Sequence, residues 1–216
     1  MDDWIAADWP APENIVAGTT LRNNDVSSLP LYGEYCWLSQ VHGTNIVSAG
    51  HFDTPPEADG STGRGAEYVC AVRTADCLPV LMCSTDGSVF AAVHAGWRGL
   101  AAGVIENTLA RLETDPADLL VWLGPAISQP SFEVGDEVRE AFLAVDPEAG
   151  ECFTANSRQR WQADLYGLAR RRLDAAGIRN VFGGGFCTYL DEERFYSYRR
   201  DPTCGRLVSF VGLNTP

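Results

Sequence analysis

The sequence has few basic residues and few histidines, and each shortage excludes a class of protein. Lys and Arg number 16 against 29 Asp and Glu, which gives a formal net charge of -13. A protein that coats nucleic acid or an anionic membrane needs a basic face, so we expect neither as a partner. The only histidines are His42, His51 and His94. They are too few for the mononuclear and trinuclear centres of a multicopper oxidase.

Long apolar runs and paired cysteine motifs are also absent. No run reaches the roughly 18 apolar residues of a membrane helix. The first ten residues are acidic, without the basic and apolar regions of a secretory signal, so we predict a cytoplasmic protein. The 7 cysteines show no C-x-x-C spacing, which favours neither a disulfide framework nor a zinc knuckle.

The apolar patterns predict a single domain over residues 1–216. Strand-like runs cover 14–20, 35–41, 45–47, 68–73, 78–83, 88–93, 119–123, 181–182 and 207–213. Helical periodicity covers 99–112, 136–145 (with Val138, Phe142 and Val145 as its apolar stripe) and 164–176. The Pro- and Gly-rich stretch 51–65, with His51, is typical of a surface loop. Strands separated by tight turns and by helices indicate an α/β (α+β) layered domain, with one mixed sheet flanked by helices.

The stretch 93–100, V-H-A-G-W-R-G-L, is where we expect chemistry. A strand end would hold His94, while Gly96 and Gly99 would let backbone approach a ligand and the next helix would begin. Asp86-Gly87 predicts a hairpin turn that brings Cys77 and His94 back to the same edge of a sheet. His42 also follows a strand and precedes a glycine, so its setting resembles that of His94.

Motifs along nearly the whole chain resemble the YfiH-like family, also called the laccase-domain, polyphenol oxidase or peptidoglycan editing factor family. The motifs are Trp9-Pro10-Ala11-Pro12, Gln40-Val41-His42-Gly43, Thr74-Ala75-Asp76-Cys77-Leu78-Pro79-Val80, Val93-His94-Ala95-Gly96-Trp97-Arg98-Gly99, Gly124-Pro125-Ala126-Ile127, Phe132-Glu133-Val134-Gly135, Cys187-Thr188 and Tyr196-Ser197-Tyr198-Arg199-Arg200-Asp201. The resemblance implies a zinc site of one Cys and two His. It also implies purine nucleoside phosphorylase activity, with adenosine deaminase and methylthioadenosine phosphorylase activities. Laccase-like oxidation and a link to peptidoglycan precursor editing are parallel assignments in that family.

The chain departs from the family pattern at one point. The family continues from Thr-Thr-Arg into a Gly-Gly-Val-Ser loop, whereas this chain passes from Thr20 directly to Leu21. We therefore expect a missing or shortened segment there, and the substrate contacts of that loop have no counterpart in this sequence.

Residue chemistry assigns the expected roles. His42, Cys77 and His94 supply two imidazoles and a thiolate, which suit tetrahedral Zn²⁺ with a fourth position free for water or substrate. The structural alternative is a buried thiol at Cys77 and two hydrogen-bonded histidines. We expect Asp76 either to shuttle protons or to orient a metal-bound imidazole.

Phosphorolysis needs cationic donors for phosphate. Arg98, at a helix start, is the preferred donor. Arg199, Arg200 and Arg206 are weaker choices, and Gly183 to Gly185 is either a loop that approaches a ligand or a tight bend.

Three functional classes remain open on the sequence alone. The first is a zinc enzyme acting on nucleosides and phosphate, the second a copper-containing, laccase-like polyphenol oxidase, and the third a hydrolase in which Cys77 is the nucleophile and His94 its base.

Overall fold

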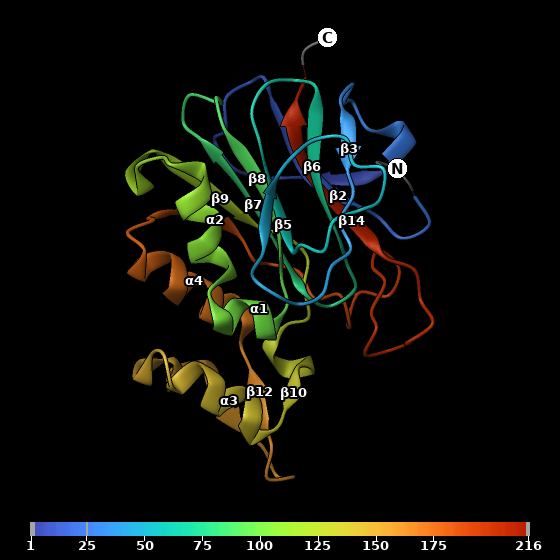
Figure 1. Cartoon of the computed structure of the whole chain (residues 1–216). Coiled ribbons are helices and arrows are strands. Elements are labelled where there is room, and N and C mark those ends of the chain that lie inside the picture. The colour runs from blue at the N-terminus through green and yellow to red at the C-terminus, as the bar shows by residue number, and fades with distance from the viewer. Residues whose placement is uncertain (1–2, 25, 215–216) are drawn as a thin grey trace.

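The computed structural model describes residues 3–24 and 26–214, which form a mixed α/β fold (Figure 1). Two large sheets pack face to face, helices cover the outer face of one of them, and a small third sheet lies beside α3. The predicted fold class is confirmed. The single mixed sheet that we expected is instead divided among three sheets.

The six-stranded sheet has parallel pairs at both edges and antiparallel pairs in its middle. Its strands, in spatial order, are β13 (Asn180–Gly183), β9 (Leu119–Leu123), β7 (Leu78–Ser84), β8 (Phe90–Ala95), β5 (Gly60–Gly63) and β4 (Ile46–Ser48). The predicted hairpin is confirmed, because β7 and β8 pair with Leu78 opposite Ala95 and Pro79 opposite His94.

The five-stranded sheet is antiparallel except at one edge, where β3 runs parallel to β6. Its strands, in spatial order, are β1 (Trp4–Ala6), β2 (Ile15–Thr20), β14 (Leu207–Leu213), β6 (Tyr68–Thr74) and β3 (Glu34–Cys36). The strand expected over 35–41 is shorter, since only a single bridge at Ser39 follows β3. Because β6 and β7 belong to different sheets, residues 75–77 cross from one sheet to the other.

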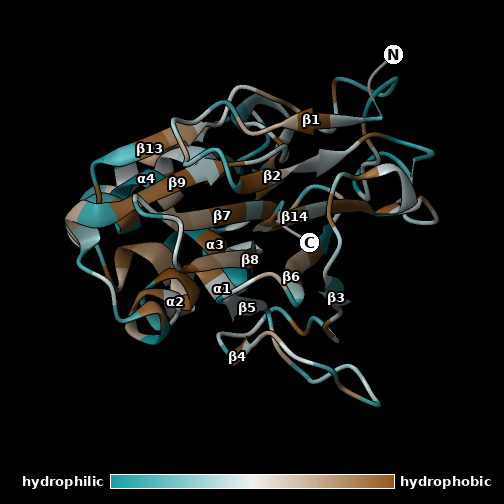
Figure 2. Ribbon diagram, turned by 90° about the horizontal axis from the view of Figure 1, so that it is seen from above, coloured by the Kyte–Doolittle hydropathy of each residue, from teal (hydrophilic) through white to brown (hydrophobic). Residues whose placement is uncertain are grey.

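The sequence of strand β7 is apolar throughout, with no alternation of polar and apolar residues, and its packing explains why. Val80 and Met82 pack in the cluster beneath the helices, whereas Leu81 and Cys83 pack in the cluster between the two sheets. Both faces of the strand are therefore buried, which removes the polar alternation of a half-exposed strand. Figure 2 shows this hydrophobic interior along β7, β8 and β9.

Glycine 103 divides the first helix, which we expected to run unbroken over 99–112. The chain forms α1 (Trp97–Ala102) and α2 (Val104–Leu112), because Gly103 adopts a left-handed conformation with φ 98° that ends α1. The remaining helices are α3 (Asp136–Leu143) and α4 (Leu165–Ala175). Val145 lies beyond the end of α3 and is 57% exposed, so its predicted place in the buried stripe is wrong.

The stretch 51–65 is only partly the surface loop that we expected. His51 is exposed, and its Nδ1 lies 2.9 Å from Glu34 Oε1, away from the other histidines. Residues 60–63, however, form the buried strand β5. Its sequence is Gly-Ser-Thr-Gly, so no apolar pattern marks it, and a Cβ at Gly63 would lie 2.7 Å from Phe90 Cζ.

The small sheet completes the described architecture. It is antiparallel, in the order β10 (Glu133–Val134), β12 (Trp161–Ala163) and β11 (Phe153–Ala155). Short 3₁₀ turns lie at 26–28, 116–118, 129–131 and 147–152. Within the described residues, no helix is both long and apolar enough to cross a membrane.

Candidate metal centre and cleft

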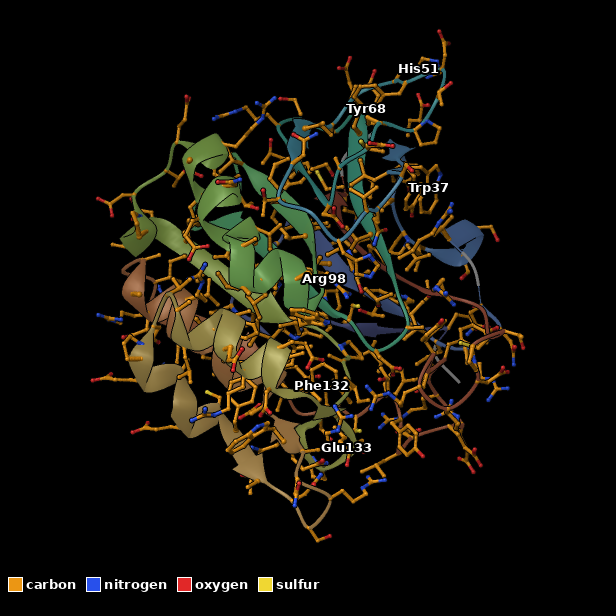
Figure 3. All side chains as sticks on the ribbon, turned by 60° about the horizontal axis from the view of Figure 1, so that its bottom comes forward. Trp37, His51, Tyr68, Arg98, Phe132 and Glu133 are labelled. Atoms are coloured by element: carbon orange, nitrogen blue, oxygen red, sulfur yellow. The ribbon has the colours of Figure 1, made fainter. Side chains whose placement is uncertain are left out.

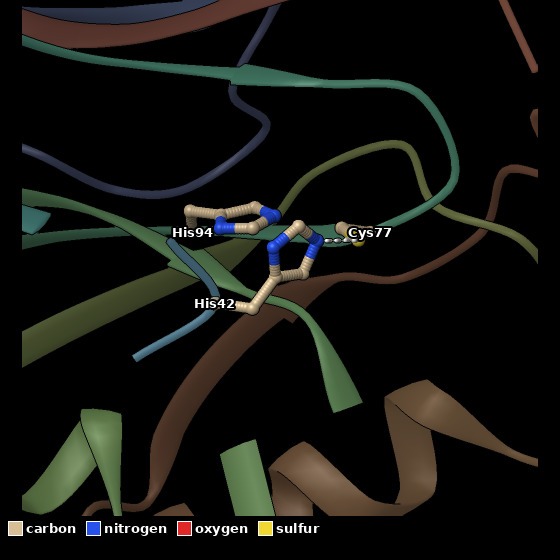
Figure 4. A group of neighbouring side chains, drawn as sticks. All are labelled: His42, Cys77 and His94. Carbon is tan, nitrogen blue, oxygen red and sulfur yellow. Dashed lines mark hydrogen bonds between the residues drawn. The ribbon is translucent and has the colours of Figure 1, made fainter. Parts of the chain in front are cut away.

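Three side chains from separate segments converge at the edge where β7 begins and β8 ends. His42 lies on the loop before β4, Cys77 directly precedes β7, and His94 lies within β8. One ligand atom from each lies within 4.8 Å of the other two, and His42 Nε2 is 4.0 Å from Cys77 Sγ (Figure 4). His42 is exposed, Cys77 half-buried and His94 buried, so the group is open on the His42 side.

The protein environment favours a charged thiolate at Cys77. Burial raises its pKa, but the imidazoles of His42 and His94 outweigh burial and lower the pKa to about 6. Burial lowers the pKa of His94, yet Asp59 and Cys77 raise it to about 9. The Cys77 thiolate is thus stabilised by the neighbouring imidazoles, and the His94 imidazolium by the thiolate and Asp59.

Asp59 organises both histidines, and sequence reasoning missed it. Its side chain is fully buried, and its Oδ1 lies 2.7 Å from His94 Nδ1. The same carboxylate accepts hydrogen bonds from three successive backbone N–H groups, those of residues 41–43, at 3.3, 2.9 and 2.6 Å. His42 has a positive φ of 59°, a conformation uncommon outside glycine that these bonds help to hold.

The bond to Asp59 determines which nitrogen of His94 is available. A carboxylate accepts a hydrogen bond from a nitrogen that carries a proton. Nδ1 is therefore the donor, and Nε2 is the nitrogen available to a metal. The backbone oxygen of Asp59 also accepts the N–H of His94 at 2.7 Å. Asp59, in the stretch 51–65 that we expected to be a surface loop, thus fixes both the backbone and the ring of His94.

Gly96 leaves room for the three side chains. A Cβ at this position would lie 3.0 Å from His42 Cδ2, 3.2 Å from Cys77 Sγ and 3.5 Å from His94 Cε1. A side chain at residue 96 would thus crowd His42 and Cys77 and would also contact His94. Gly99 allows the backbone of the His42 loop to lie close to α1, because a Cβ at residue 99 would lie 2.6 Å from the carbonyl oxygen of Gly43. Both glycines thus allow close approach within the protein, and the approach of backbone to a ligand stays a prediction.

Asp76 does not orient an imidazole, contrary to one of its two expected roles. Its Oδ1 accepts the hydroxyl of Thr188 at 2.7 Å, and its Oδ2 accepts the hydroxyl of Ser197 at 3.0 Å and the backbone N–H of Arg199 at 2.7 Å. The residue itself has a positive φ of 90°. Its carboxylate therefore fixes the segment 197–199 beside the turn that carries Cys77.

A cleft of about 690 Å³ opens from the three candidate ligands. Four arginines line it, and each has its guanidinium group near an aromatic ring: Arg73 at 4.3 Å from Trp37, Arg98 at 4.4 Å from Trp97, Arg199 at 5.7 Å from Phe132 and Arg206 at 5.7 Å from Tyr198.

None of the four cleft arginines forms an ion pair with a carboxylate of the described residues, whereas Arg158 and Arg171 elsewhere do. Contact with a ring orients a guanidinium group and leaves its N–H edges free. The cleft is thus locally cationic in an acidic protein.

Two other sequence candidates lie outside the cleft. Arg200 donates to the backbone oxygens of Thr188, Tyr189 and Phe195, so it stabilises its own loop. Gly183 ends β13, and a Cβ there would lie 2.8 Å from Trp122 Nε1, which favours the tight bend over a ligand loop.

The fold and the site together define a YfiH-like α/β protein, with two histidines and one cysteine at the mouth of an arginine-lined cleft. The chain belongs to the family whose model is described as "Multi-copper polyphenol oxidoreductase laccase", which matches residues 15–214.

Curated relatives in this family are similar over their full length. The "Purine nucleoside phosphorylase YfiH" of Escherichia coli (strain K12) is 42% identical over 244 residues, which cover 99% of this chain and 100% of that protein. The "Purine nucleoside phosphorylase PA4543" of Pseudomonas aeruginosa is 43% identical over 241 residues, with 99% of each covered. Both alignments are longer than the 216 residues of this chain, so these relatives carry residues that it lacks. The expected location of the gap, at Thr20, remains a prediction.

Solved structures agree with the fold. The structure of protein NMB0706 from Neisseria meningitidis superposes with a TM-score of 0.93 at 38% identity, covering 99% of this chain and 100% of that one. YlmD from Geobacillus stearothermophilus gives a TM-score of 0.87 at 26% identity, covering 98% and 96%.

Proposed function

We propose that this protein is a zinc-dependent purine nucleoside phosphorylase acting on adenosine, inosine and guanosine, with adenosine deaminase and S-methyl-5'-thioadenosine phosphorylase activities. The single observation that carries the proposal is the convergence of His42, Cys77 and His94 within 4.8 Å at one end of a cationic cleft. The names of the relatives support the phosphorylase class.

The three side chains fit a zinc ion. Ligand atoms around tetrahedral Zn²⁺ lie about 3.3–3.6 Å apart. Those of the three residues lie within 4.8 Å of one another, with His42 Nε2 4.0 Å from Cys77 Sγ, so small side-chain movements would bring them to an ion. The space that Gly96 leaves beside all three side chains supports the same fit. When bound, zinc would supply a Lewis acid that polarises a substrate oxygen or activates water. Copper is the alternative occupant, since two imidazoles and a thiolate suit it as well.

The remaining roles belong to the chain itself. Asp59 would hold His94 in the tautomer that ligates metal, and Asp76 would place Tyr198 and Arg199 at the cleft. The rings of Phe132 and Tyr198 offer faces for a purine base. The guanidinium group of Arg98, which has no hydrogen-bonding partner among the described residues, would bind phosphate through its free N–H groups.

Product analysis of the purified protein with adenosine tests the proposal. With phosphate we expect adenine and ribose 1-phosphate, and without phosphate slow formation of inosine. Arg98→Ala should lower phosphorolysis at least about tenfold, because a charge-assisted hydrogen bond is lost, and should spare deamination. Arg111→Ala, an exposed change on α2 outside the cleft, is the matched control. Equal loss of both reactions in Arg98→Ala would show that Arg98 is not specific for phosphate.

A further inference from the structure

A second, smaller cavity adjoins the cleft. Its volume is about 350 Å³, and it lies between the start of α1, strand β10 and the start of α3. Trp97, Arg98, Phe132 and Arg199 line both cavities and form the boundary between them. In Figure 3, Arg98 lies beside α1, and Phe132 and Glu133 follow toward the small sheet. Arg160 lines the second cavity but not the cleft.

The arginines of this cavity have unused donors. Among the described residues, Arg98, Arg160 and Arg199 form no ion pair with a carboxylate. The guanidinium group of Arg199 makes one hydrogen bond, from Nη1 to the backbone oxygen of Glu133 at 3.1 Å, and that of Arg98 makes none. Three guanidinium groups around one small space match an oxyanion with several acceptor oxygens.

Of the two acidic residues of the cavity, Glu133 already has partners. It is paired with Arg158, and its Oε2 accepts the amide of Asn156 at 2.7 Å. The carboxylate of Glu137 lies over Gly135, at the start of α3, where a helix favours negative charge. Three arginines thus face one remaining carboxylate, that of Glu137, and the cavity keeps a net positive charge.

Gly135 keeps space for one of these arginines. A Cβ there would lie 2.7 Å from Arg160 Nη1 and would collide with the Glu137 carboxylate. The tips of these two flexible side chains therefore both lie against Gly135 at this wall of the cavity.

We infer that the second cavity is the binding site for inorganic phosphate, held by Arg98, Arg160 and Arg199, while the nucleoside occupies the cleft. This inference rests on the proposed phosphorolysis. A phosphate oxygen would reach the ribose across the boundary formed by Arg98 and Arg199. There the new bond joins that oxygen to C1', the bond from C1' to N9 breaks, and its electron pair leaves with the purine. The proton of HPO4²⁻ balances the one that the purine takes up.

Steady-state kinetics of Arg160→Gln tests the inference, because this residue lines only the second cavity. We expect the KM for inorganic phosphate to rise about tenfold or more, since a charge-assisted donor is lost. The KM for adenosine, the phosphate-independent deamination and the zinc content should not change. Arg206→Gln, which alters only the cleft, should act on the nucleoside KM instead, and Arg111→Gln is the neutral control.

Direct binding separates this inference from the activity. Calorimetric titration of the zinc protein with inorganic phosphate should give a Kd that Arg160→Gln weakens by the same factor, while Arg160→Lys, which keeps the charge, recovers part of it. An unchanged phosphate KM in a folded Arg160→Gln protein overturns the subsite and leaves the proposed function standing. A wild-type protein that neither binds nor consumes phosphate overturns both.

Discussion

The two sides of the cleft are constructed by different means. On the metal side, the fully buried Asp59 carboxylate holds the loop of His42 and the ring of His94 through four hydrogen bonds, and Cys77 directly precedes the buried strand β7. On the arginine side, the exposed guanidinium groups of Arg98, Arg199 and Arg206 lie on a helix start and on loops, where ring contacts orient them. A buried hydrogen-bond network restrains its members more tightly than contacts between exposed side chains do. Substitutions on the metal side should therefore change the zinc content, whereas those on the arginine side should leave it the same.

The largest effect should follow from removing a ligand on the metal side. Cys77→Ala and His94→Ala should each lose most of the zinc that the purified wild-type protein holds, about one ion per chain, because two remaining ligands bind Zn²⁺ weakly. Elemental analysis after gel filtration measures this. Cys187→Ala, which removes a thiol outside the site, should keep its zinc. Full retention in both ligand variants would contradict the metal assignment.

Cys77 should change its reactivity when the metal is removed. In the zinc protein the sulfur is committed to the ion and should resist iodoacetamide. In chelated protein the pKa of about 6 makes it mostly thiolate at pH 7, and its alkylation rate should rise through about pH 6 and then level off. Peptide mapping distinguishes it from the other thiols. Rapid alkylation with zinc bound, or full activity after chelation, would favour the Cys77–His94 hydrolase.

Asp59→Asn should weaken the metal site without abolishing it. The amide would donate to His94 Nδ1 and leave the proton on Nε2, the nitrogen that should bind zinc, so zinc affinity should fall about 10–100-fold. Competition with a chromophoric chelator measures the affinity. ¹⁵N shifts of the metal-free protein above about pH 9, where the wild-type His94 imidazole is neutral, report the tautomer. The control is Asp53→Asn, which alters an exposed carboxylate near His51. An unchanged tautomer would refute this role for Asp59.

Asp76→Asn should give the smallest effect, on stability and on the arginine side. The variant loses part of the network to Thr188, Ser197 and Arg199, which should cost about 1–2 kcal/mol in the free energy of unfolding. Zinc content should stay the same. Urea denaturation and metal analysis together check this, and zinc loss equal to that of Asp59→Asn would place Asp76 on the metal side.

Sequence reasoning predicted features that local pattern determines. Strands 119–123 and 207–213 have the bounds expected of apolar runs, and the hairpin followed from its Asp-Gly turn. The approach of His42, Cys77 and His94 was also anticipated. The hairpin explains the approach of Cys77 to His94, but His42 lies on a loop and not at the strand end that we expected.

Features that depend on distant partners were not predictable in the same way. Asp59 lies in a Pro- and Gly-rich stretch, and it is buried only because the small residues of β5 pack against β8. Two of the cleft arginines have aromatic partners from distant segments, namely Trp37 for Arg73 and Phe132 for Arg199. No local signal in the sequence encodes such pairs.

The position of β14 in the sheet has a consequence for folding during synthesis. This strand lies between β2 and β6, so the five-stranded sheet lacks its central strand until residues 207–213 have left the ribosome. Until then β2 and β6 present unpaired edges, which are templates for aggregation in a nascent chain. Arg206 directly precedes this strand, and Asp76 follows the end of β6 with only Ala75 between them. Arg199 and Arg206 therefore reach the cleft last during synthesis, after His42, Cys77 and His94 have already emerged.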